Sequence, residues 1–216
     1  MTVPRHLVIF ARFPQAGAGK RRLANGIGVV QALRFQRVRL AVLINRHGRD
    51  PRWTTWLAVT PDRSQPWPSH VRIVGQGRGD LGQRMGRVMT VLPAGLVVIV
   101  GTDIPGISAA AIVRAFNALG RHDAVFGPAG DGGYWLIGLK RTPKLRLPFA
   151  GVRWSSANAL ADTEHNLRGA RIAHVDRLDD VDDAASWRDQ PRWARMCAAQ
   201  YPTCLNNFAS RKAGIQ

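Results

Sequence analysis

Short apolar runs alternate with longer amphipathic stretches along most of the chain. The runs are rich in Val, Ile and Leu, a composition typical of buried strands. The longer stretches repeat their apolar residues every three or four positions, which predicts helices that pack on those strands. The alternation predicts an α/β fold with a mostly parallel central sheet and helices on both faces.

The predicted strands are 7–11, 53–59, 70–74, 96–100, 124–126, 134–139 and 171–175. Helices are expected from the glycine-rich turn at 17–19 to Gly48, over 81–92, from Ser108 to about 119, after a cap at Ser155 or Ser156, and over 182–198. We expect residues 1–200 to form a single domain and residues 201–216 a peripheral tail.

The composition fits a protein with one sizeable core. The chain has 216 residues, of which 45% are hydrophobic, enough for one α/β domain. No run approaches the roughly 18 apolar residues of a membrane span, and no signal-peptide cleavage site follows the start. We therefore expect a cytoplasmic protein without membrane insertion. Cys197 and Cys204 lack the spacing of a zinc site or a disulfide framework, and the oligomeric state stays open.

The chain is strongly basic, with 31 Lys and Arg against 14 Asp and Glu, a formal net charge of +17. The arginines are scattered and form no basic run interleaved with aromatic residues, so we do not expect nucleic acid as a partner. A non-catalytic, basic nucleic-acid-binding protein remains the alternative from another class, and it predicts salt-sensitive binding. No acid precedes Asp50, whereas acids crowd 176–183. An anion would favour the first third of the chain and a cation the last.

The turn after the first strand has the residues of a phosphate-binding loop. Gly17 and Gly19 allow backbone amides to approach phosphate oxygens, and a helix follows them. Arg12, Lys20 and Arg22 add positive charge. No Ser or Thr follows Lys20, which excludes a Walker loop. A flexible basic surface turn would have the same composition.

Asp103 follows the most strand-like run of the chain, 95–100. The carboxyl ends of strands in open α/β sheets are where ligands bind, and a carboxylate there suits Mg²⁺ or Mn²⁺. A helix or turn cap is the alternative role of Asp103.

Two later segments also carry acids in suggestive settings. Asp131 stands among glycines in Gly130-Asp131-Gly132-Gly133-Tyr134, which favours a backbone pressed against a ligand or, alternatively, a tight hairpin turn. Asp180 and Asp182 alternate on an extended stretch and would project to one side, as a divalent ion requires. Asp182 or Asp183 could instead cap the next helix.

Taken in order, several motifs resemble those of bacterial DUF2064 proteins. These motifs are Phe10-Ala11-Arg12 with Pro14, Gly17, Lys20, Arg22 and Leu23; Gly79-Asp80-Leu81-Gly82-Gln83-Arg84-Met85; Gly101-Thr102-Asp103-Ile104-Pro105; His122-Asp123; Gly127-Pro128; and Asp131-Gly132-Gly133-Tyr134-Trp135-Leu136-Ile137-Gly138. The resemblance runs from about Leu7 to Trp187. Proteins of this family are described as glycosyltransferases of the radical-SAM/selenodomain-associated type and are related to phospholactate guanylyltransferases.

The resemblance implies a Rossmann-like GT-A fold, that of nucleotide-diphospho-sugar transferases. It implies a nucleotide-binding site formed by Ala11, Arg12, Gly17, Lys20 and Arg22. It also implies that Asp103 binds the metal, Mg²⁺ or Mn²⁺, and that the segment containing Asp180 and Asp182 helps to hold it. The chain departs from the family pattern at three positions: Arg21 replaces a threonine, and Ala184 and Ser186 replace a proline and an acid.

The function expected from these residues is metal-dependent transfer from a nucleotide or nucleotide-sugar donor to a small-molecule acceptor. Glycosyl transfer follows the family description, and nucleotidyl transfer of the phospholactate guanylyltransferase type is the alternative. Lys20, Asp103 and Asp131 are the expected catalytic residues, with Asp131 orienting an acceptor hydroxyl or taking its proton. Gly132, Gly133 and Tyr134 are the expected substrate-binding residues.

Overall fold

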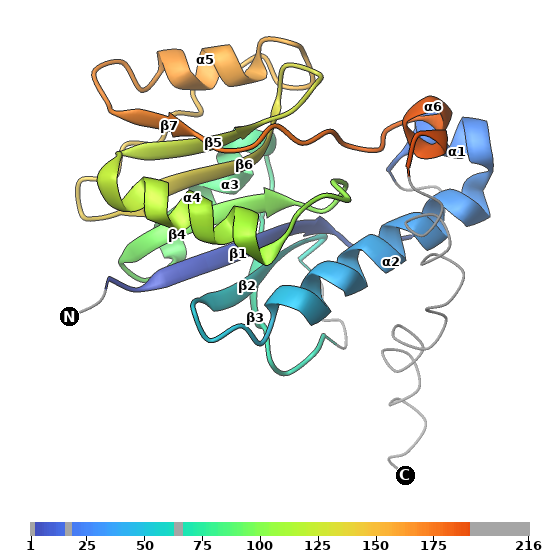
Figure 1. Ribbon diagram of the computed structural model, residues 1–216, viewed down its shortest axis with the longest axis horizontal. Coiled ribbons are helices and arrows are strands. Elements are labelled where there is room, and N and C mark those ends of the chain that lie inside the picture. The colour runs from blue at the N-terminus through green and yellow to red at the C-terminus, as the bar shows by residue number, and fades with distance from the viewer. Residues whose placement is uncertain (1–2, 16–18, 63–66, 191–216) are drawn as a thin grey trace.

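A computed structural model of the chain describes residues 3–15, 19–62 and 67–190. The described part forms one seven-stranded sheet with helices on both faces (Figure 1). The strand order is β3-β2-β1-β4-β6-β5-β7. Only β6 among these strands runs antiparallel to its neighbours. The expected α/β fold with a mostly parallel sheet is confirmed.

The strands are β1 (Arg5–Arg12), β2 (Thr54–Thr60), β3 (Arg72–Gly75), β4 (Gly95–Gly101), β5 (Ala124–Pro128), β6 (Tyr134–Arg141) and β7 (Ile172–His174). The helices are α1 (Arg21–Ile27), α2 (Val29–His47), α3 (Leu81–Val91), α4 (Ala109–Arg121), α5 (Ala159–His165) and α6 (Ala184–Arg188). None of the helices in these ranges is long and apolar enough to cross a bilayer.

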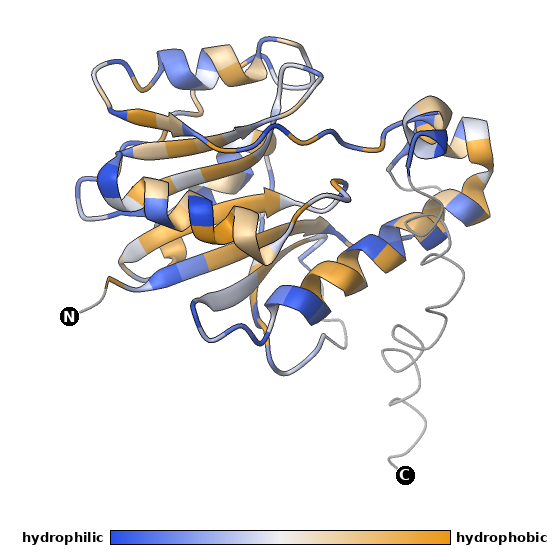
Figure 2. Ribbon diagram, in the orientation of Figure 1, coloured by the Kyte–Doolittle hydropathy of each residue, from blue (hydrophilic) through white to orange (hydrophobic). Residues whose placement is uncertain are grey.

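Two apolar cores hold the helices on the sheet. On one face, residues of α2 and α4 such as Leu40 and Phe116 pack against Ile9 and Val98 of the strands. On the other face, Met89 of α3 and its neighbours pack against the opposite side chains of the same strands. Figure 2 shows the central strands apolar over most of their length, and α2 and α4 carrying both apolar and hydrophilic residues. Buried strands covered by amphipathic helices on both faces are what the sequence pattern predicted.

The structure corrects three of the predicted helices. The long helix predicted up to Gly48 is broken at Gly28, whose φ of 88° lies in the left-handed region, so that α1 and α2 are separate. The helix predicted after Ser155 or Ser156 begins only at Ala159, without a side-chain cap. Ser155 has a left-handed φ of 58°, and Ser156 accepts a hydrogen bond from the Asn158 amide in the preceding loop.

The helix predicted from Asp182 to about Ala198 begins at Ala184, because Asp183 forms its capping box with Ser186, and it ends at Arg188, with Asp189 as its C-cap. The tail predicted at 201–216 and both cysteines lie outside the described residues. By contrast, Ser108 caps α4 as predicted, with its hydroxyl accepting from the Ala111 amide at 3.2 Å.

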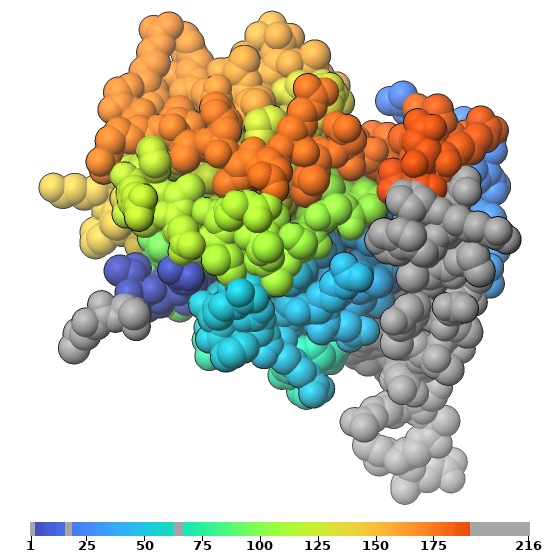
Figure 3. All heavy atoms as spheres, in the orientation of Figure 1, coloured from blue at the N-terminus to red at the C-terminus, as the bar shows by residue number. Residues whose placement is uncertain are grey.

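The segment that joins β7 to α6 passes the carboxyl ends of the strands (Figure 1), and it lies at the surface of the molecule on the face seen in Figure 3. Backbone amides tie it to three places along this edge: Val175 donates to Phe126, Leu178 to Pro128, and Val181 to Asp103. At its far end α6 packs beside α1 and α2, with Trp187 against Phe35. The acid-rich stretch 176–183 is thereby brought to the turn after β1, although more than 150 residues separate them.

Candidate functional site

A cavity of about 810 Å³ opens at the carboxyl ends of β1, β2 and β4. Many separate parts of the chain line it, and four of them carry the predicted site residues: the end of β1 with the turn that follows it, the loop after β4, the turn before β6, and the segment between β7 and α6. Nine of the predicted site residues line it: Ala11, Arg12, Lys20, Arg22, Asp103, Asp131, Tyr134, Asp180 and Asp182. The fold therefore brings most of the predicted residues to one place, where open α/β sheets bind their ligands.

The remaining predicted residues lie elsewhere. Gly17 is outside the described residues. Gly132 and Gly133 are near the cavity but do not line it. Gly132 has a φ of 83°, and a side chain there would lie 2.2 Å from the carbonyl oxygen of Ala157. Its own carbonyl accepts from the Leu160 amide at 3.1 Å. Gly132 thus allows the turn before β6 to pack tightly against the loop at 154–159.

Lys20 lies at the centre of the acids. Its side chain is only 6% exposed, and its ammonium is 3.0 Å from a carboxylate oxygen of Asp103 and 2.5 Å from one of Asp182. It also donates to the carbonyl oxygen of Val181 at 2.6 Å. Burial lowers the pKa of Lys20, but the two carboxylates outweigh it and leave the pKa above its ordinary value. Lys20 is therefore charged, and its charge is matched by acids from two segments.

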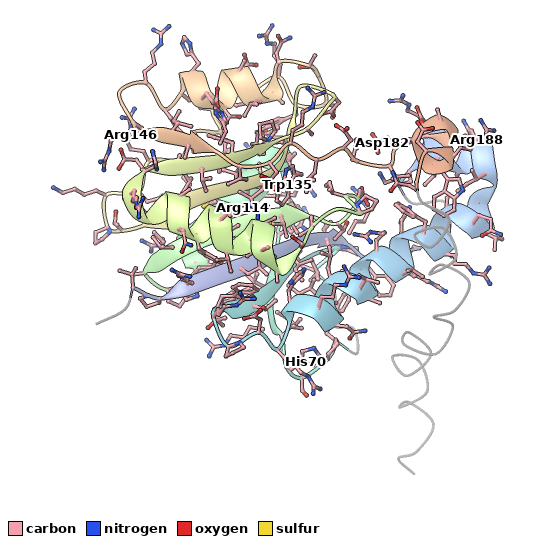
Figure 4. The ribbon with its side chains drawn as sticks, viewed as in Figure 1. His70, Arg114, Trp135, Arg146, Asp182 and Arg188 are labelled. Carbon is pink, nitrogen blue, oxygen red and sulfur yellow. The ribbon has the colours of Figure 1, made fainter. Side chains whose placement is uncertain are left out.

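The surroundings of Asp180 disfavour the ionised form of its carboxyl group. Burial and the negative charges of Asp182 and Asp131 raise its pKa to about 6, although Lys20 pulls it down. Burial acts on Asp182 in the same direction, but its hydrogen bond to Lys20 prevails and the pKa of Asp182 is lowered. Asp182 lies on the segment that joins β7 to α6 (Figure 4). Negative charge is concentrated here beyond what Lys20 neutralises.

Within the described ranges, no group of three or more His, Cys, Asp or Glu side chains is arranged to enclose a metal ion. The donors that the cavity does offer are carboxylate oxygens of Asp103, Asp180 and Asp182, which are hard ligands of the kind that Mg²⁺ and Mn²⁺ prefer. Mg²⁺ often takes only one or two protein carboxylates and completes its shell with water and substrate phosphates. The donor set fits such a partly open site.

Two of the predicted basic residues, Arg22 and Arg12, have different surroundings. Arg22 is largely exposed, and its guanidinium is 3.5 Å from Asp183. Arg12 lines the cavity from the end of β1.

The turn containing Asp131 is held by a hydrogen bond of its own, because the Gly133 amide donates to the Asp131 carboxylate at 2.8 Å. Tyr134 follows it, and burial raises the pKa of its hydroxyl above the ordinary value.

Sequence reasoning missed several lining residues. Gln76 and Arg84 line the cavity, as do Trp154, Ser155 and Ser156. Arg84 lies in the stretch 79–85 that carried the family resemblance, but no role was derived for it because a first-turn arginine looks like an ordinary surface residue. The left-handed φ of Ser155 has no signal in the sequence, since such a conformation is expected at glycine or asparagine.

Several solved structures have the same architecture as this chain. A protein of Desulfovibrio desulfuricans G20, provisionally named a nucleotide-diphospho-sugar transferase, superposes with a TM-score of 0.78 at 24% identity, covering 93% of this chain and 99% of its own. The 4-diphosphocytidyl-2C-methyl-D-erythritol synthase of Anaerococcus prevotii DSM 20548 gives 0.55 at 12% identity, with 85% and 94% covered. A homologue of Mycobacterium tuberculosis Rv0371c from Mycobacterium sp. strain JC1 gives 0.53 at 15% identity, with 90% and 97% covered.

The fold is thus the Rossmann-like one of nucleotide-diphospho-sugar transferases, as the sequence motifs implied. The model of the family described as "Uncharacterized protein conserved in bacteria (DUF2064)" matches residues 29–156. The chain belongs to the DUF2064 family. No curated protein matched the sequence.

Proposed function

We propose that this protein is a metal-dependent transferase that binds a nucleotide or nucleotide sugar in the cavity and transfers the glycosyl group to a small-molecule acceptor. The observation that carries the proposal is the meeting, in one cavity, of cationic residues after β1 with aspartates from three other segments. Cations suit the phosphates of a nucleotide and aspartates suit a divalent ion. The fold, shared with proteins named for nucleotide chemistry, supports the same conclusion.

Mg²⁺ or Mn²⁺ is the proposed cofactor, with Asp103 as its main ligand and either Asp180 or Asp182 as a second one. Burial and the negative charges of Asp182 and Asp131 raise the pKa of Asp180, and this gathering of negative charge is the observation that favours a cation there. When bound, the ion supplies positive charge against the negative charge that develops on the leaving diphosphate.

The residues of the chain then have distinct tasks. The end of β1, at Ala11 and Arg12, and the turn containing Gly17 bind the nucleotide with Lys20 and Arg22. Lys20 also keeps Asp103 and Asp182 together. Asp131 orients an acceptor hydroxyl or takes its proton, and the Gly132-Gly133-Tyr134 stretch positions the acceptor beside it.

Nucleotidyl transfer is a second candidate, favoured by the likeness to the Anaerococcus prevotii synthase, whose name describes a diphosphocytidyl product. In glycosyl transfer a nucleoside diphosphate leaves and the sugar moves. In nucleotidyl transfer pyrophosphate leaves and a nucleoside monophosphate moves. Release of pyrophosphate on incubation with a nucleoside triphosphate and acceptor therefore distinguishes the two reactions.

The proposal predicts metal-dependent nucleotide binding that requires Asp103. In a thermal-shift panel of nucleoside triphosphates and nucleotide sugars, at least one ligand should raise the melting temperature with Mg²⁺ or Mn²⁺ and not with EDTA. Asp103→Asn should weaken that binding at least tenfold, because a carboxylate ligand becomes a neutral amide. Asp179→Asn is the matched control, since Asp179 is an exposed neighbour that does not line the cavity.

A panel with no stabilising nucleotide would overturn the proposal. If the protein instead bound DNA or RNA in a salt-sensitive manner that Asp103→Asn left unchanged, the non-catalytic nucleic-acid-binding alternative would take its place.

A further inference from the structure

The cations of the cavity fall into two groups that differ in their partners. Lys20 is held by Asp103 and Asp182, and Arg22 is paired with Asp183. Arg12 and Arg84 also line the cavity, but no described carboxylate forms an ion pair with either guanidinium. Their positive charge is therefore available to a ligand, whereas that of Lys20 is already matched.

Arg84 is held in place by neutral groups. Its Nη1 donates to the side-chain oxygen of Gln76 at 3.0 Å, and its Nε lies 3.3 Å from the carbonyl oxygen of Asp80. The guanidinium carbon is 5.9 Å from the centre of the Phe10 ring. These contacts orient the guanidinium without cancelling its charge.

Gln76 is itself fixed at the edge of the sheet. It is 1% exposed, and its side-chain nitrogen donates to the carbonyl oxygens of Ala11 in β1 and Ala58 in β2, each at 2.9 Å. Because both donors of the amide are used, its oxygen must face Arg84 and cannot exchange with the nitrogen. The orientation of Arg84 is thus set by the sheet.

Arg12 and Arg84 are also close enough to repel each other. Partial burial and the nearby charge of Arg12 lower the pKa of Arg84, and only Asp80 acts in the opposite direction. Within the described residues, the Arg12 guanidinium makes no hydrogen bond, and the Arg84 guanidinium bonds only to Gln76 and Asp80. An anion that binds between the preorganised Arg84 guanidinium and the Arg12 guanidinium relieves the repulsion between them.

We infer that Arg84 and Arg12 form a phosphate-binding subsite that does not require the metal, with Gln76 as its positioning residue. Two planar guanidiniums offer several parallel donors, which match the oxygens of a phosphate group. The inference deepens the proposed function, on which it rests, by placing one phosphate of the bound substrate away from the aspartates. That phosphate belongs to the donor nucleotide or to a phosphorylated acceptor, and the chemistry of recognition is the same for both.

The test measures binding of inorganic pyrophosphate in EDTA, by ³¹P NMR line broadening at low ionic strength, and binding of the best nucleotide with Mg²⁺. The variants are Arg84→Gln and Arg84→Lys. Arg78→Gln is the matched control, because it removes the same charge from an exposed residue of the same segment that does not line the cavity. Circular dichroism melting verifies that the variants are folded.

Arg84→Gln should weaken pyrophosphate binding at least tenfold relative to Arg78→Gln, since a charge-assisted hydrogen bond is lost. The affinity of Arg84→Lys for pyrophosphate should lie between those of the other two variants, because lysine keeps the charge but lacks the planar guanidinium. A parallel loss in nucleotide binding assigns the phosphate to the donor. A loss confined to pyrophosphate supports the subsite and assigns it to the acceptor.

Equal binding by Arg84→Gln and Arg78→Gln, for both pyrophosphate and nucleotide, would overturn the subsite while leaving the proposed transferase standing. The opposite outcome is also possible to read: if Arg84→Gln lost pyrophosphate binding while the unsubstituted protein bound no nucleotide at all, the subsite would stand and the proposed function would fail.

Discussion

At the scale of single residues, the carboxylates around Lys20 bring together more negative charge than Lys20 neutralises. Asp180 carries the clearest sign of this, with a pKa of about 6. Because the folded protein holds the proton of Asp180 more tightly than the unfolded chain does, this residue favours folding most at low pH. Its contribution is lost as the pH rises from about 4 through 6.

Asp180→Asn should therefore stabilise the protein at pH 7.5, by about 1 kcal/mol after allowance for the solvent exposure of the site. The gain should shrink towards pH 3, below the ordinary pKa of an aspartate, where Asp180 is mostly protonated in both states. Urea unfolding at the two pH values measures it, with Asp179→Asn as the control. A gain that is the same at both pH values would show that relief of charge repulsion is not its cause.

The sequence allowed the aspartates of the cavity to be predicted but not their partners. Asp103 follows a buried strand, and the ends of parallel strands meet at one edge. The ion pairs of Lys20 depend on a segment that returns more than 150 residues later, and no local pattern encodes that return. Arg84 could not be found because its role depends on the tertiary contact with Gln76.

At the scale of elements, the turn before β6 and the loop before α5 support each other. Gly132 makes this possible, since its left-handed φ and its contact with Ala157 both exclude a side chain. The loop that it supports carries Trp154, Ser155 and Ser156 to the cavity wall. The start of the helix in this region was predicted too early, because Ser155 and Ser156 resemble N-caps, whereas the Ser156 hydroxyl accepts a hydrogen bond within the loop.

Gly132→Ala should destabilise the protein by about 3 kcal/mol, from backbone strain together with a clash against the Ala157 backbone. Gly169→Ala is the matched control: Gly169 has the same φ of 83°, but nothing lies within 4 Å of the added carbon. It should cost about 1 kcal/mol, from strain alone. Urea unfolding of the two variants, compared with that of the unsubstituted protein, measures both losses. Equal losses would mean that the loop moves freely and is not supported by this turn.

At the scale of the whole molecule, the apolar pattern predicted the class of fold, because buried strands and one-sided helices leave distinct periodicities. The sheet order and the antiparallel direction of β6 could not be predicted in this way, since strand pairing is non-local. The charge asymmetry was informative: the basic turn near the start and the acidic segment near residue 180 meet across the carboxyl edge of the sheet.

The meeting of these two segments is the basis of the proposed nucleotide site, and a crystal structure with MnCl₂ and the best-binding nucleotide tests it most directly. The anomalous signal of manganese should lie in the cavity, with a carboxylate oxygen of Asp103 and a phosphate oxygen each within about 2.5 Å. A nucleotide bound outside the cavity, or a manganese ion without contact to Asp103, would contradict the proposal.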